Sequence, residues 1–61
     1  MYYVFHYKGR SAEKVIDRIT PFLDIANTAA REQSKDGHTR YVSEYLTDKH
    51  LYAWRNGGSA A

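Results

Sequence analysis

The chain has 61 residues, enough for one small domain, and it contains no cysteine. A domain of this size buries only about 60% of the surface of its unfolded chain. Without cysteine there are no disulfide bonds and no thiolate metal sites. The three histidines match no metal-binding spacing, so we expect neither a metal nor a cofactor. The net charge of +2 is too small to indicate a nucleic-acid-binding protein by itself.

No apolar run approaches the roughly 20 residues that a membrane-spanning helix needs. The N-terminal residues 2–5 are aromatic and aliphatic, without the charged segment and small-residue cleavage site of a secretion signal. We therefore expect a cytoplasmic protein that does not contact membranes. Stability beyond that of its small core would come from a bound partner, either a protein target or a second copy.

Residues 2–8 are aromatic and β-branched almost throughout, which predicts a strand. Ser11 is expected to cap a helix that follows. From Ala12 to Ala30, apolar residues recur at steps of three and four. This spacing is typical of an amphipathic helix with one buried stripe.

Pro21 interrupts the predicted helix. It either kinks the helix or marks a restart in which Thr20 is the cap and Pro21 takes the first position. Because the apolar stripe keeps its phase across the proline, we favour a single kinked helix. Gly37 is suited to the left-handed conformation that follows a helix end.

Residues 39–55 contain two aromatic and β-branched runs around the polar segment 47–49, which predicts a hairpin. A helical alternative exists, because part of this segment also fits a helix and loosely resembles the end of a helix-turn-helix unit. The stretch between Leu46 and Trp54 is short for that arrangement. Residues 57–61 are expected to be a flexible tail, which leaves residues 1–56 as the domain.

These elements predict a small α+β domain of β-α-β-β order. It would have a three-stranded, mainly antiparallel sheet with one helix on one face. For the hairpin, we expect a register that places Leu46 opposite Leu51. Side chains alternate across a strand, so the sheet then has an aliphatic face and an aromatic face. The helix would pack on the aliphatic face, which includes Val4 and Val42. The uncovered aromatic face would consist of Tyr3, Phe5, Tyr7, Tyr41, Tyr45, Tyr52 and Trp54.

Seven large rings exceed the apolar patch that a monomer usually leaves exposed, and Tyr and Trp are enriched in interface hot spots. The sequence therefore favours a non-enzymatic module that binds a protein target, or forms a homodimer, through this face. An alternative arrangement, in which the aromatic face is the core beneath the helix, stays open. The size and element order are similar to those of small phage-borne inhibitors, including some anti-CRISPR proteins. That likeness of shape implies an inhibitor or regulator of this kind.

Two other functions remain as alternatives. An aromatic sheet can stack single-stranded bases, and cations at its margins could then contact phosphates. The candidates for those contacts are Lys8, Arg10, Arg40, Lys49 and Arg55. The second alternative is a minimal ribonuclease toxin that uses His6, His38 or His50 as acid and base. No nucleophile motif or phosphate-binding glycine loop is present, so we expect no catalytic residues.

Overall fold

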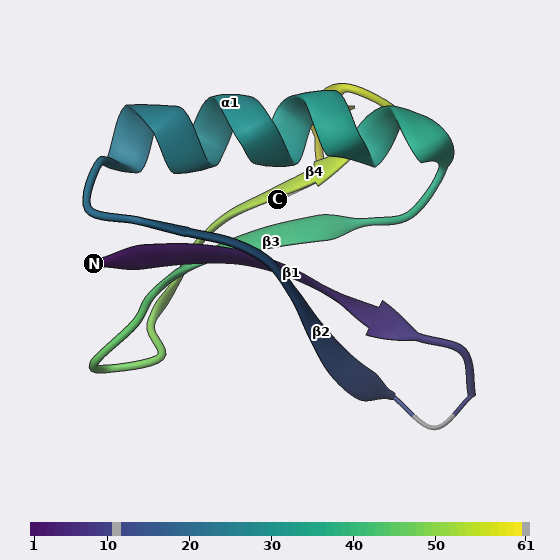
Figure 1. Cartoon of the computed structure of the whole chain (residues 1–61). Helices are drawn as coiled ribbons and strands as arrows, with labels where there is room; N and C mark the ends of the chain where they lie inside the picture. Colours follow the sequence, from purple (N-terminus) through teal and green to yellow (C-terminus); the bar gives the residue numbers. More distant parts are fainter. Residues whose placement is uncertain (11, 61) are drawn as a thin grey trace.

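The computed structural model describes residues 1–10 and 12–60. It has one helix packed on a five-stranded antiparallel sheet, with strand order β2-β1-β3-β4-β5. The elements are β1 (Tyr2–Lys8), β2 (Glu13–Thr20), α1 (Leu23–Gln33), the 3₁₀ helix η1 (Ser34–Asp36), β3 (Arg40–Glu44), β4 (His50–Arg55) and β5 (Gly58–Ser59). Figure 1 shows α1 lying across one face of the sheet. The α+β class is confirmed, but the prediction of three strands is wrong, since β2 and β5 were not expected.

The segment from Glu13 to Thr20 is the edge strand β2, whereas its apolar spacing predicted a helix. The cause is a bulge: β1 residue Phe5 pairs with Ile16, and Tyr3 pairs with Ile19. One extra residue on β2 therefore brings two isoleucines, three positions apart, onto the same face of the sheet. A helix would place them together by a different geometry, so their spacing does not distinguish the two structures. The expected capping residue, Ser11, lies outside the described residues.

Helix α1 begins only after Pro21, at Leu23, so the prediction of one kinked helix is wrong. A residue that precedes proline is biased towards extended backbone, which agrees with β2 ending at Thr20. The Thr20 hydroxyl accepts a hydrogen bond from the Phe22 N–H at 3.2 Å, just before the helix. At the other end, Gly37 follows η1 with φ of 93°, which confirms the expected left-handed conformation.

Strands β3 and β4 form the expected hairpin, so the helical alternative for this segment is wrong. The expected register, with Leu46 opposite Leu51, is also wrong. It would place Tyr52 opposite Tyr45, whereas Tyr52 lies opposite Val42. The turn is closed by a hydrogen bond from the Glu44 N–H to the Lys49 carbonyl at 2.9 Å. An odd shift in register moves side chains to the other face of a sheet. For this reason Tyr52 lies on the face of Val42.

The core beneath the helix is small and aliphatic. Val4, Val42, Ala26 and Ala30 are fully buried, and Trp54 packs against them. The two valines confirm that the helix covers the predicted aliphatic face. This core lies between the sheet and the helix. Within the described residues, no element packs on the other face of the sheet.

The residues after β4 are joined to the rest of the fold. Ser34, fully buried at the start of η1, accepts hydrogen bonds from the backbone N–H groups of Asn56 and Gly57. Gly58–Ser59 then pairs with β4 as β5. Strand β5 thus lies within the segment that we expected to be a flexible tail. Among the described residues, no helix is long and apolar enough to cross a membrane.

The core assignment can be tested with Val42→Ala. Removing two methyl groups from this fully buried site should destabilise the protein by about 2 kcal/mol, through lost burial and the cavity that remains. Leu46→Ala is the matched control, because Leu46 is 84% exposed and its truncation should cost less than about 0.5 kcal/mol. Urea unfolding measures both. Equal losses would contradict the assignment of Val42 to the core.

Candidate functional site

The helix-free face of the sheet carries a connected group of rings, which we call the aromatic cluster. It consists of Tyr3, Phe5, Tyr7, Tyr41, Tyr45 and His50. Phe5 is central: its ring stacks on those of Tyr3 and Tyr41, with centroid distances of 5.1 and 5.3 Å. Tyr7 meets Phe5 edge-on at 5.5 Å, and Tyr45 meets Tyr3 edge-on at 5.8 Å. The structure thus brings together five of the seven predicted aromatic residues.

Tyr52 and Trp54 do not belong to the aromatic cluster, which corrects their predicted place. Trp54 lies opposite Arg40 and packs against the aliphatic core, and its indole N–H donates a hydrogen bond to the Asn27 side chain. From the sequence, we did not expect His50 on the aromatic face. A bulge in β4 places it there, opposite Ser43. The bulge itself has no signal in the sequence that we could have used.

The rings of the aromatic cluster cover one another to different extents. Phe5 is fully buried and Tyr3 is 4% exposed, although no helix lies above them. At the border of the cluster, Tyr7 and Tyr45 are 41% and 50% exposed. Ile16 and Ile19, which pair with Phe5 and Tyr3 across the sheet, are about half exposed beside them. The apolar side chains exposed around the buried rings are therefore those of Ile16, Ile19, Tyr7 and Tyr45.

A polar group closes one side of the aromatic cluster. The Tyr3 hydroxyl donates a hydrogen bond to Asp48 and accepts one from Lys14 Nζ at 3.0 Å. Lys14 Nζ also lies 4.5 Å from the centroid of the Phe5 ring, within the range of a cation–π contact. Burial and the bond to Asp48 raise the pKa of Tyr3, and the same bond lowers the pKa of Asp48. The buried tyrosine hydroxyl thus has the partners that it requires.

The five candidate phosphate-binding residues do not form one surface. Arg40 is 7% exposed, because it pairs with Asp36 at 2.9 Å and with Asp17 at 3.1 Å. Lys8 and Arg10 lie at the end of the β1–β2 hairpin, and Lys49 lies in the β3–β4 turn. Figure 1 places these two turns at different corners of the molecule.

A second group of side chains lies on the helix side of the sheet, beyond the end of the helix. We call it the polar cluster: His6, Asp17, Asp36, His38 and Arg40. His6 Nδ1 lies 2.8 Å from Asp17 Oδ2, and the ring centroids of His6 and His38 are 6.0 Å apart. The pKa of Asp36 is lowered, first by the His38 backbone N–H and then by Arg40. Among the described residues, no three potential ligands are placed to hold a metal ion.

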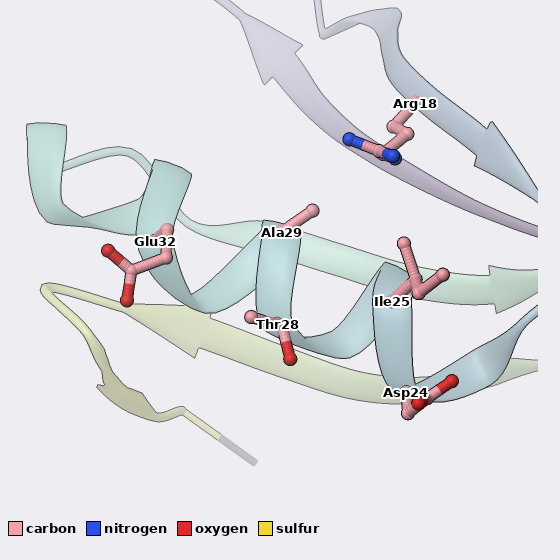
Figure 2. Close-up of a pocket in the computed structure, with 6 residues that line it drawn as sticks. All are labelled: Arg18, Asp24, Ile25, Thr28, Ala29 and Glu32. Carbon is pink, nitrogen blue, oxygen red and sulfur yellow. The ribbon is translucent and has the colours of Figure 1, made fainter.

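A shallow groove of about 290 Å³ separates β2 from the helix. Its lining residues are Arg18, Asp24, Ile25, Thr28, Ala29 and Glu32. In the view of Figure 2, Ile25 and Ala29 project from the helix on the side of Arg18, whereas Asp24 and Thr28 project from its opposite side. The groove therefore has an apolar wall on the helix and a cation on the strand.

Comparisons with known protein families, curated proteins and solved structures found no match to this chain. The structure offers three candidate surfaces, which are the aromatic cluster, the polar cluster and the groove beside β2.

The bond between Tyr3 and Asp48 should make stability depend on pH. Because the folded state lowers the pKa of Asp48, this bond contributes stability above the ordinary pKa of 3.8 and loses it as the pH falls through the lower folded value. Asp48→Asn and Tyr3→Phe should each lose less stability than the wild type between about pH 5 and pH 2. Urea midpoints at several pH values measure this. If both variants follow the wild-type curve, the bond does not stabilise the fold.

Proposed function

We propose that this chain is a non-enzymatic binding module whose working surface is the helix-free face of the sheet. The observation that supports this most directly is a set of half-exposed apolar side chains around the buried rings of Tyr3 and Phe5. Tyr7 and Tyr45 at the border of the aromatic cluster, and Ile16 and Ile19 beside it, are each 41–50% exposed on one face. Exposed apolar groups that adjoin one another are typical of interaction sites, whereas single scattered ones are not.

The geometry favours a protein partner over single-stranded nucleic acid. Base stacking needs a ring whose flat side is open to the base. In the aromatic cluster, the flat sides of Tyr3, Phe5 and Tyr41 face one another, and Lys14 covers Phe5. One of the candidate cations is also unsuited, since Arg40 is held by two carboxylates. An apolar protein surface, by contrast, needs only the exposed tyrosines and isoleucines.

The partner is either a target protein or a second copy of the chain. On this face, the described residues form a hollow of about 190 Å³ beside Tyr41 and His50, and no carboxylate, lysine or arginine is among the residues that line it. We therefore propose that it acts by covering a surface of its partner, as an inhibitor or regulator does. If the chain also forms a dimer through this face, the second copy and the target protein would compete for the same surface.

Tyr45→Ala tests the working surface, and Phe22→Ala is its control. Both aromatic side chains are 50–58% exposed, but Tyr45 lies beside Tyr3, whereas Phe22 lies immediately before helix α1. With the chain immobilised in a cell extract of its source, Tyr45→Ala should reduce the retained proteins by about tenfold, as expected for an interface aromatic. Sedimentation measures the same effect on a dimer.

Circular dichroism should show that both variants remain folded. Retention by the wild type should hardly change with added salt, whereas phosphate contacts weaken steeply. Equal effects of the two substitutions would contradict the proposed surface. A steep salt response would favour nucleic acid instead.

A second candidate function is ribonuclease activity at the polar cluster. It is favoured by the contact of His6 with Asp17 and by the neighbouring His38 ring. In the tautomer whose Nδ1–H donates a hydrogen bond to Asp17, His6 Nε2 is free to accept the proton of a ribose 2′-hydroxyl. The 2′-oxygen would then attack phosphorus to give a 2′,3′-cyclic phosphate. The 5′-oxygen would leave with a proton from protonated His38. This function ranks second because two carboxylates outweigh Arg40 at the site, and they repel phosphate.

A labelled oligoribonucleotide tests this activity. His6→Ala and His38→Ala should each reduce cleavage at least about a hundredfold, the usual contribution of a general acid or base. His50→Ala is the control, since His50 contacts Phe5 in the aromatic cluster on the other face. Cleavage should yield the cyclic phosphate. Absence of cleavage by the wild type, or equal activity of all three variants, would rule out this candidate.

A further inference from the structure

The outer edge of β2 is unpaired in the part of the chain that the structure describes. β2 stands first in the strand order and pairs only with β1, along Glu13–Thr20. The opposite edge of the sheet is formed by β5, which pairs only with Trp54 and Arg55, and by the remainder of β4. An unpaired strand of eight residues presents alternate N–H and C=O groups that only another extended backbone can satisfy in sequence.

Both faces beside this edge carry apolar groups that an added strand could cover. On the helix-free face, Ile16 and Ile19 are 49% and 46% exposed. On the helix side, the groove between β2 and the helix has Ile25 and Ala29 on its wall. Side chains of an added strand alternate between the two faces. Alternate residues of the added strand would therefore pack on Ile16 and Ile19, and the residues between them would lie over the groove. Figure 2 shows the lining of this groove.

Arg18 indicates the charge that such a strand should carry. It lines the groove from β2, where it lies opposite Val4 on the helix side of the sheet. Among residues 1–10 and 12–60, Arg18 takes part in no ion pair, unlike Arg40. Of the two carboxylates along the groove, Glu32 is already paired with Lys35 at 3.1 Å. The other, Asp24, projects from the side of the helix that faces away from Arg18 (Figure 2). Next to β2, an acidic side chain is therefore the complementary group.

Two features of β2 would limit pairing with unsuitable strands. The bulge between Ile16 and Arg18 increases the local twist, and Lys14 places a charge near the edge. Natural sheets use both devices against unspecific edge pairing. A partner would then be selected by its side chains, and Arg18 is the charged group best placed to do so.

We propose that β2 binds an extended segment of another protein as an added antiparallel or parallel strand. The segment has apolar side chains at alternate positions and an acidic side chain opposite Arg18. This proposal rests on the proposed role in protein binding, but it uses the edge of the sheet, the groove and the two isoleucines of β2. The aromatic cluster is not part of this contact.

The probe is an eight-residue peptide with valine at alternate positions, one central glutamate and threonine elsewhere. Its control has lysine in place of the glutamate. NMR titration of the ¹⁵N-labelled chain measures affinity, and amide hydrogen exchange measures protection of β2. The glutamate peptide should slow exchange in β2 and bind at least about threefold more tightly than the lysine peptide, within the range of an exposed ion pair.

Substitution of Arg18 makes the test specific. Arg18→Gln should remove the preference between the two peptides, and Arg18→Glu should reverse it, while circular dichroism shows a folded chain. Tyr45→Ala should leave peptide binding unchanged, because Tyr45 belongs to the aromatic cluster. The extract experiment on Tyr45 therefore tests the proposed function separately from this one.

Three results would overturn the proposal. The first is that neither peptide slows exchange in β2. The second is that Arg18→Glu keeps the wild-type preference, or that Tyr45→Ala abolishes peptide binding, which would move the contact to the aromatic cluster. The third is that β2 becomes protected with rising protein concentration and no peptide, which would identify a second copy as the occupant of this edge.

Discussion

One helix has to serve the whole sheet, and this constraint organises the rest of the structure. Helix α1 has 11 residues and is therefore about 16 Å long. It buries Val4 and Val42 through Ala26 and Ala30, and this small core leaves the far face of the sheet to other residues. Sheets with apolar side chains on both faces need cover on both. The fold therefore depends on how the helix-free face is closed.

The aromatic cluster closes that face by covering its own centre. Phe5 is fully buried because the rings of Tyr3 and Tyr41 stack on it and Lys14 Nζ lies 4.5 Å from its centroid. The cost of burying the Tyr3 hydroxyl is offset by its bonds to Asp48 and Lys14. The cluster is consequently part of the core at its centre and part of the surface at its border. For this reason the border residues Tyr7 and Tyr45 remain exposed, and we propose them for binding.

Much of the charge of the chain is used within the fold. Arg40 pairs with two aspartates, Lys14 pairs with Asp48, and His6 contacts one of the same aspartates as Arg40. Recognition by these groups would require their present contacts to break. Arg18 differs because it lines a groove beside an unpaired strand. The two surfaces that we propose for a partner are therefore mainly apolar, and Arg18 is a cation beside one of them.

By itself, the sequence determined the α+β class and the strand at residues 2–8. It favoured the hairpin in 39–55 and the side of the sheet that the helix covers, but it left an alternative to each open. Composition and alternation carry that information within each segment, as Val4 and Phe5 on opposite faces illustrate. Only the tertiary structure decided that Glu13–Thr20 is a strand and that Tyr52 and Trp54 lie away from the aromatic cluster. Both outcomes depend on bulges, in β2 and in β4. A bulge adds one residue relative to the neighbouring strand, so it is defined by the pairing between two strands. The sequence of the bulged strand alone shows no periodic pattern that reveals it.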